Sequence, residues 1–312
     1  MAHGARVMRF RRFEPLGRDL SLLVLGTAVF EHASYEESTP LLDAWAEAGG
    51  NTIDTGRQYG NAESIVGRWL AERQLHGTMT VITKGGHHDE ITLRPRLSAA
   101  DLAEDLAESR RQLRRDTIDL LLLHRDDPAR GAPAILDDLT AVADGDVRVL
   151  GASNWSTERL DAAARHAALN GVRGFSCSSP NLSLAVANEP PWPGCVSILR
   201  GADDEWYERT QLPVFAWQAL AGGFFAGVRD PAMQGVYGGA DNEERLARAR
   251  VVADRYGATP TQVALAWVLA RPYPVHAIVG PHSHEELQDC VAALDLELAA
   301  DELAWLDLDE RT

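Results

Sequence analysis

The chain has 312 residues, of which 45% are hydrophobic and 24% are charged, a composition typical of a soluble globular protein rather than a disordered one. Its 46 acidic and 30 basic residues give a formal net charge of −16. Nucleic acids and anionic membrane surfaces are bound through clustered basic residues, so the charge argues against both as partners. The length allows one large domain or two ordinary ones.

Neither a membrane span nor a secretory signal is expected. No apolar run approaches the roughly 18–20 residues needed to cross a bilayer, and the basic start MAHGARVMRFRRF lacks an uninterrupted apolar segment and a cleavage site. The three cysteines, Cys177, Cys195 and Cys290, are far apart and show no metal-ligand spacing. We therefore expect free thiols in a reducing cytoplasm.

Short apolar runs alternate with amphipathic segments along nearly the whole chain. The runs are continuously apolar rather than alternating, which is typical of parallel strands covered on both faces. The eight predicted strands are residues 22–28, 51–55, 79–84, 118–124, 147–154, 174–179, 213–218 and 275–280.

Helix start and stop signals separate these strands. The predicted helices begin at Thr39-Pro40, after Asn61, after Ser98 and after Ser156. The first of these helices is expected to end at Gly49-Gly50, and the helix after Ser156 at Asn170-Gly171. Further helices are predicted over residues 131–144, 242–256, 261–270 and 283–294.

Eight strand–helix units in one chain predict a single-domain (β/α)₈ TIM barrel, of the α/β class, over residues 1–312. Residues 1–20 would form an N-terminal cap or tail, and residues 180–198 and 222–241 would be long loops at the active-site face. A doubly wound sheet is the structural alternative. However, the first strand ends Leu25-Gly26-Thr27-Ala28, which is not the Gly-x-Gly-x-x-Gly fingerprint of that fold.

Ionisable residues stand at the ends of three successive predicted strands. Asp54, Lys84 and His124 end strands two, three and four, and Tyr59 follows Asp54 by five residues. Taken singly, each residue would be interpreted as a helix cap, a loop anchor or a solvated side chain. In (β/α)₈ barrels, however, the catalytic residues stand at the C-terminal ends of the strands, so the four together indicate an active site. A tyrosine with a pKa of about 10 needs a neighbouring cation to act near neutral pH. Lys84 could supply it, held by Asp54, while His124 donates to a substrate oxygen.

Four segments containing these residues resemble the aldo-keto reductases. NTIDTGRQYGNAESIVGRWL (51–70) is similar to the family signature Asp-Thr-x-x-x-Tyr-Gly-x-x-Glu. ITKGG (82–86), DLLLLHRDDP (119–128) and GASNW (151–155) follow in family order. The resemblance implies a barrel that reduces aldehydes and ketones with NADPH or NADH. It makes Tyr59 the general acid/base.

The resemblance also implies a dinucleotide site along the same face. By this resemblance, Ser153 and Asn154 contact the nicotinamide and the Trp217 ring stacks on it. The segment from Trp217 to Gly222 forms a loop around the pyrophosphate. Ser283 stands at the start of a helix whose N-terminus faces a phosphate. The full predicted set is Gly26, Thr27, Asp54, Ser153, Asn154, Trp217, Gln218, Leu220, Gly222, Gly280, His282, Ser283, Glu286 and Asp289.

This site departs from the family pattern at three places. The strand-six glutamine is absent from Ser176-Cys177-Ser178, Cys290 stands where many members have Asn, and Glu286 stands where many have Arg, Lys or Gln. Glu286 would repel a 2′-phosphate if it pointed there. NADP(H) is therefore favoured only slightly, and NAD(H) stays open.

The predicted substrate pocket mixes charged, polar and aromatic side chains, which suits a sugar-like or other polar carbonyl better than a steroid. Its residues are His32, Arg57, His87, Arg125, Trp155 and Trp192. The pair His87-His88 has no third ligand by spacing, so no metal is expected.

The leading interpretation is a cytoplasmic oxidoreductase whose partner is a small carbonyl or alcohol substrate. Two alternatives remain. One is a redox-neutral epimerase or eliminase that retains its nicotinamide cofactor. The other is a cofactor-sensing, non-enzymatic subunit. The sequence is silent on oligomeric state and on the direction of the reaction.

Overall fold

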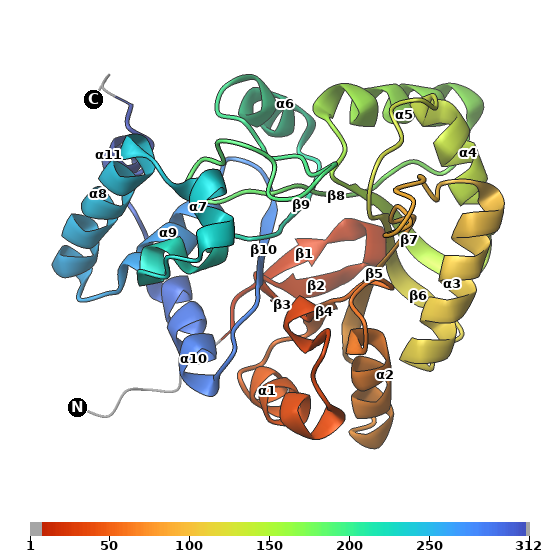
Figure 1. The fold of residues 1–312 in the computed structure, drawn as a ribbon, viewed down its shortest axis with the longest axis horizontal. Helices are drawn as coiled ribbons and strands as arrows, with labels where there is room; N and C mark the ends of the chain where they lie inside the picture. Colours follow the sequence, from red (N-terminus) through yellow and green to blue (C-terminus); the bar gives the residue numbers. More distant parts are fainter. Residues whose placement is uncertain (1–7, 310–312) are drawn as a thin grey trace.

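A computed structural model describes residues 8–309 of the chain, and its centre is a closed barrel of eight parallel strands (Figure 1). Each strand pairs with the next one along the chain, and β10 closes the ring against β3. The eight predicted strands are all present, which confirms the (β/α)₈ barrel. The strands are β3 Leu23–Gly26, β4 Thr52–Asp54, β5 Thr80–Gly85, β6 Ile118–Leu123, β7 Val147–Ser153, β8 Ser178–Ser179, β9 Val214–Ala216 and β10 Val275–Val279.

Helices surround the barrel on its outside (Figure 1). They are α1 Tyr35–Glu47, α2 Ala62–Glu72, α3 Ala99–Leu113, α4 Ala132–Val142, α5 Thr157–Asn170, α6 Ala202–Thr210, α7 Pro231–Tyr237, α8 Ala240–Tyr256, α9 Pro260–Leu269, α10 His284–Ala292 and α11 Ala300–Leu306. The short helices α6 and α11 have no counterpart among the predicted segments.

Side-chain caps explain where several helices begin. Ser98 and Ser156 accept hydrogen bonds from the third backbone N–H of α3 and α5, as expected for N-caps. The expectation that the first helix begins at Thr39-Pro40 is wrong. Ser34 and Glu37 form a capping box that starts α1 at Tyr35, and Pro40 lies inside the helix.

An antiparallel hairpin closes the N-terminal end of the barrel. It consists of β1 (Phe10–Phe13) and β2 (Arg18–Ser21), joined through the 3₁₀ helix η1 (Glu14–Leu16). Phe13 and Leu20 are buried in a cluster with residues of the strands that point into the barrel, among them Val24, Leu120 and Phe215. Of the segment expected as an N-terminal cap or tail, residues 1–7 lie outside the described part of the chain.

The two segments expected as long loops differ from each other. Residues 180–198 are irregular apart from isolated bridges at Asn181. Residues 222–241, in contrast, contain the end of η3 (Ala221–Ala226), all of α7 and the start of α8. The glycines and Pro231 suggested a loop, but Pro231 is the first residue of α7 and Asp230 caps that helix by accepting from the Ala232 N–H at 2.9 Å.

A second apolar layer lies between the barrel and the helices and includes the fully buried rings of Trp45, Trp69 and Trp267. All three cysteines are free and buried. Within residues 8–309, no helix is both long and apolar enough to cross a membrane.

Candidate active site

A buried ion pair joins the ends of β4 and β5. These strands are parallel neighbours, so their C-terminal ends lie at one rim of the barrel. The Lys84 Nζ lies 2.6 Å from both carboxylate oxygens of Asp54 and donates to the Thr55 carbonyl at 2.8 Å. Burial lowers the pKa of Lys84, but the charge and hydrogen bonds of Asp54 outweigh it and the net pKa is raised. The ammonium is therefore charged at neutral pH.

Tyr59 lies beside this pair. Its ring centroid is 5.0 Å from the Lys84 Nζ, and its ring meets that of His124 edge-on at 5.5 Å and 84°. Burial raises the pKa of Tyr59 above its ordinary value, and the charge of Lys84 offsets only part of that rise. The phenol is thus protonated at neutral pH and is a proton donor, with a cation next to it that stabilises the phenolate once the proton has left.

His124, at the end of β6, is neutral. It is 5% exposed, and its backbone N–H donates to the Gly85 carbonyl at 2.7 Å. Burial, followed by the charges of Arg125 and Lys84, lowers its pKa well below the ordinary value. Its Nδ1 is buried and has no hydrogen-bond partner among the described residues. Buried polar groups are normally satisfied, so this nitrogen is an exception that calls for an explanation.

Two further imidazoles extend from His124 toward the surface. The His87 ring lies 4.7 Å from His124 and 4.1 Å from His88. The Nδ1 of His87 is 2.9 Å from the His88 carbonyl, which can only accept, so this nitrogen carries the proton. Burial lowers the pKa of His87 to about 4. Within residues 8–309, no three His, Cys, Asp or Glu side chains form a candidate metal site.

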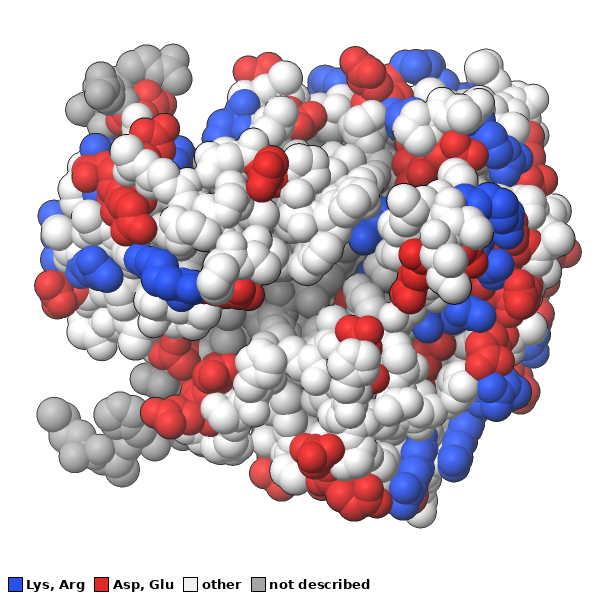
Figure 2. Space-filling model, viewed as in Figure 1, with Lys and Arg blue, Asp and Glu red and all other residues white. Residues whose placement is uncertain are grey.

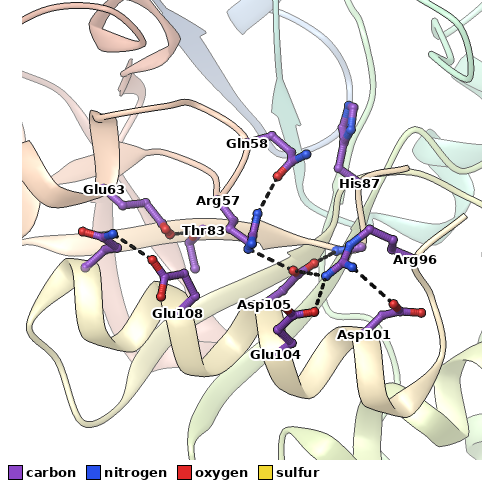
Figure 3. A network of polar contacts seen from close by, with 12 residues as sticks. Arg57, Gln58, Glu63, Thr83, His87, Arg96, Asp101, Glu104, Asp105 and Glu108 are labelled. Carbon is purple, nitrogen blue, oxygen red and sulfur yellow. Dashed lines mark hydrogen bonds and ion pairs between the residues drawn. The ribbon is translucent and has the colours of Figure 1, made fainter. Parts of the chain in front are cut away.

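A polar network behind this rim fixes Arg57 (Figure 3). The Arg57 Nε is 3.0 Å from the Asp105 carboxylate, which is also 2.7 Å from Arg96 and accepts from the Gly86 N–H at 2.8 Å. Asp105 is 3% exposed. The sequence did not single it out, although an acidic residue on the apolar face of helix 99–113, next to Leu106, is a usable signal.

Ser153 and Asn154, predicted to bind nicotinamide, bond to other parts of the rim. Asn154 adopts a φ of 60° and donates to the His124 carbonyl at 3.1 Å, and its Oδ1 accepts from the Val196 N–H at 3.1 Å. Ser153 donates to the Ser179 carbonyl at 2.7 Å. Asn154 thereby joins β6, β7 and the 180–198 segment.

The predicted ring partner of nicotinamide, Trp217, follows β9. Its Nε1 is buried and unpartnered among the described residues, and its ring lies 6.0 Å from that of Trp192, which is 48% exposed. Gln218 adopts a φ of 48° and accepts from the Tyr237 hydroxyl at 2.6 Å. Leu220 precedes η3, where Gly222 has a φ of 61° that favours glycine.

The remaining predicted cofactor residues begin at the ends of β3 and β10. A Cβ added to Gly26 would come within 2.9 Å of Ile278, so β3 and β10 approach closely there. A Cβ added to Gly280 would lie 3.9 Å from the Gly26 carbonyl oxygen. Thr27 donates to the Asp54 carbonyl at 3.0 Å.

The N-terminus of α10 is covered by its own acidic residue. The Glu286 carboxylate accepts from the His282 N–H at 2.8 Å, and the Ser283 hydroxyl accepts from the Glu286 N–H at 3.1 Å. The Asp289 carboxylate instead contacts the start of α9, where it accepts from Gln262 at 2.6 Å. A phosphate at this terminus would compete with Glu286 for the His282 N–H.

Two residues lie away from the places expected for them, and a third observation concerns the missing glutamine. His32 projects into solvent with an 89% exposed side chain. Trp155, expected to line the substrate pocket, is instead 1% exposed and packs edge-on against Phe175 at 5.1 Å. The Ser178 hydroxyl bonds to the Tyr207 hydroxyl at 2.9 Å, so it is occupied where the missing glutamine would stand.

The residues present fit a nicotinamide dinucleotide at this face. The His124 Nδ1 and the Trp217 Nε1 are buried polar atoms without hydrogen-bond partners among the described residues, and Gly222 is exposed. Figure 2 shows the hollow at the centre of this face, bordered largely by uncharged atoms, with acidic residues on its lower margin.

A parallel barrel with Tyr, Lys, Asp and His at its C-terminal rim is the arrangement of a nicotinamide-dependent oxidoreductase. Residues 22–308 match the model of the Aldo/keto reductase family, and the chain belongs to this family. Members act on carbonyl or alcohol groups with nicotinamide cofactors.

Three curated proteins illustrate the similarity. "Aldo-keto reductase ausK" of Emericella nidulans is 31% identical over 87% of this chain and 72% of its own length. "Putative aryl-alcohol dehydrogenase AAD14" of Saccharomyces cerevisiae is 26% identical, over 93% and 83%. "Protein tas" of Escherichia coli is 26% identical, over 96% and 97%.

Proposed function

We propose that the protein reduces an aldehyde or ketone to an alcohol with NAD(P)H, using Tyr59 as the general acid. The observation that carries the proposal is the placement of the Tyr59 phenol next to both the buried Lys84–Asp54 pair and the neutral His124. This set provides a proton, a cation for the phenolate and a donor for the substrate oxygen.

Each residue has a separate role in this scheme. The substrate carbonyl oxygen accepts hydrogen bonds from the Tyr59 hydroxyl and His124, which hold it and polarise it. A nicotinamide dinucleotide held at this face would supply the hydride. Tyr59 gives its proton to the resulting alkoxide, and Lys84 stabilises the phenolate that remains. Asp54 fixes Lys84 in place through two 2.6 Å contacts. In the oxidation direction the same phenolate takes the proton back.

For the cofactor, we propose NADP(H) as the slightly favoured dinucleotide, with NAD(H) as the alternative. Support for this weak selectivity comes from Glu286, whose carboxylate covers the His282 N–H at the start of α10. A helix N-terminus attracts anions, and an acidic cap weakens that attraction. A preference for NADPH of about a hundredfold, equivalent to about 2.7 kcal/mol, would contradict this part of the proposal.

The substrate is a polar carbonyl compound, supported by Arg57, His87 and Arg125 around the rim. Sugar-like ketones fit this polarity. Aromatic aldehydes are the second candidate, supported by the Trp192–Trp217 pair and by the aryl-alcohol dehydrogenase names of yeast relatives. The buried free thiols support a reducing cytoplasm as the site of action.

The test is to follow nicotinamide absorbance with purified protein and a panel of keto-sugars and aromatic aldehydes. Stoichiometric cofactor oxidation supports the proposal. Product formation without a net absorbance change would favour the redox-neutral epimerase or eliminase. Cofactor binding with no turnover of any carbonyl would favour the sensing subunit.

A further inference from the structure

Arg125 is a cation without an acidic partner at the rim of the barrel. It directly follows His124, and its Nη1 donates to the His124 carbonyl at 3.0 Å. No carboxylate of the described residues lies within ion-pair distance of it, and its Nε is buried without a partner. A half-buried guanidinium left in this state retains most of its capacity to bind an anion.

The other cations around it are neutralised. Lys84 is paired with Asp54, and Arg57 with Asp105 (Figure 3). The acidic residue next to Arg125, Asp126, is held by two hydrogen bonds from Arg159 at 2.6 and 2.7 Å. In a chain with a net charge of −16, an unpaired arginine among paired neighbours points to an anion supplied from outside.

The guanidinium is also close to the reacting groups and held in place. Its charge lowers the pKa of His124 and of His87. Its side chain packs against Gly194 of the 180–198 segment, where an added Cβ would lie 3.4 Å from the Arg125 Cδ. A fixed guanidinium loses little conformational freedom when it binds, so its charge acts efficiently.

Arg125 lies on a different part of the barrel rim from the residues predicted to contact the dinucleotide phosphates. The predicted phosphate contacts, Gly222 and Ser283, follow β9 and β10, whereas Arg125 follows β6, with β7 and β8 between them in the barrel. The anion that it faces is therefore on the substrate side. A single guanidinium beside neutral histidines balances one negative charge, which matches a carboxylate better than a doubly charged phosphate.

From these observations we infer that Arg125 binds a carboxylate of the substrate, so that the substrate class is an aldehyde or ketone that also carries a carboxylic acid. The inference rests on the proposed carbonyl reduction and refines its substrate. The carboxylate pairs with Arg125 while the carbonyl oxygen lies between Tyr59 and His124, and the reaction at the carbonyl is unchanged.

The test compares each acid with its own methyl ester. The substrates are 3-formylbenzoate and 4-formylbenzoate, which place the charge at two distances from the aldehyde, and their methyl esters, which keep the ring but remove the charge. Because the ester withdraws electrons more strongly than the carboxylate, the acid-to-ester ratio is compared between wild type and variants. We expect kcat/KM to favour the acid of at least one pair. A hydrogen bond to a charged group contributes enough that Arg125→Gln should lower this acid-to-ester ratio by about 10- to 100-fold.

Matched variants identify the charge responsible. Arg125→Lys should retain part of the acid preference. Arg57→Gln removes an arginine that Asp105 already neutralises, so it should change the ratio much less than Arg125→Gln does. Raising the salt concentration should lower the ratio in the wild type and have little effect in Arg125→Gln, because screening acts on the charge pair.

The possible failures are distinguishable. If the esters are reduced as well as the acids, and Arg125→Gln leaves the ratio unchanged, the inference is overturned and carbonyl reduction stands. If none of the aldehydes is reduced, both this inference and the proposed carbonyl reduction are contradicted. Inhibition by benzoate provides a second measurement: we expect its inhibition constant to rise in Arg125→Gln, and an unchanged constant counts against the inference.

Discussion

The Lys84 ammonium lies 2.6 Å from each carboxylate oxygen of Asp54, and both side chains are almost inaccessible to water. The two residues come from neighbouring strands, so closing the barrel brings them together. The pair is neutral as a unit, yet it leaves a fixed positive charge 5.0 Å from the centre of the Tyr59 ring. That charge is present before any substrate arrives.

Breaking this pair should destabilise the fold. Lys84→Met leaves the Asp54 carboxylate buried and unpaired, which should cost about 3–5 kcal/mol in the free energy of unfolding measured with urea. The double variant Asp54→Asn/Lys84→Met should recover part of the loss, because no uncompensated charge is then buried. A double variant less stable than Lys84→Met alone would contradict this explanation.

Removing the Tyr59 hydroxyl should abolish most turnover. Tyr59→Phe takes away the proton donor but keeps the ring against His124, so kcat should fall by about 10²–10⁴-fold. Cofactor affinity, followed by quenching of tryptophan fluorescence, should be retained. Tyr35→Phe is the matched control, since the Tyr35 hydroxyl donates to the exposed Glu72 at 2.6 Å. Activity in Tyr59→Phe equal to that of this control would disprove the assignment.

The pH profiles of reduction and oxidation should run in opposite directions. The pKa of Tyr59 is raised by burial, so the phenol remains a donor throughout the neutral range. Reduction should therefore stay level from about pH 7 to about pH 10 and fall above that, while oxidation, which needs the phenolate, rises with pH. The pKa of His124 is far below the ordinary value, so no inflection from it is expected near neutrality. A decline in reduction centred near pH 7 would be inconsistent.

Acid should destabilise the protein partly through His276. This residue of β10 is 1% exposed, and burial lowers its pKa from 6.5 to about 4. The unfolded chain takes up this proton below pH 6.5 and the folded chain does not, so stability falls between these values by about 3 kcal/mol. In His276→Gln the free energy of unfolding should depend less steeply on pH over that interval. An unchanged slope would rule out this contribution.

Neutralising Glu286 should shift cofactor preference toward NADP(H). Glu286→Gln removes the negative charge at the start of α10, which should raise the affinity for NADP(H) relative to NAD(H) by about two- to fivefold. Dissociation constants for both cofactors are the measurement. Glu285→Gln removes a charge from the same turn without a contact to His282 and should have a smaller effect. Equal effects of the two variants would show that the specific contact is unimportant.

The sequence predicted the barrel and the four rim residues because their signals are local. Buried parallel strands are continuously apolar, and residues at strand ends share one rim whatever the details of packing. Placements that depend on distant contacts could not be predicted in the same way. The burial of Trp155 against Phe175, the pairing of Asp105 with Arg57 and Arg96, and the engagement of Asn154 with Val196 are set by which segments meet after the barrel has closed.

A cap or tail was expected over residues 1–20, but the two strands of the N-terminal hairpin were not predicted, since β1 and β2 are short and lie around the left-handed Gly17. Their pairing is supported from outside by contacts with the barrel, such as the hydrogen bond from Arg11 to the Val275 carbonyl at 2.8 Å. Short strands with little apolar surface of their own give a weak signal before that contact is known.

The hairpin carries Phe13 and Leu20 into the barrel from its N-terminal end, where they pack against strand side chains that fill the interior. The interior of such a barrel is a packed core and not a channel. The hairpin therefore supports the barrel from the end opposite to the rim that holds Tyr59, Lys84 and His124, and it can change the stability of the protein without touching the reacting groups.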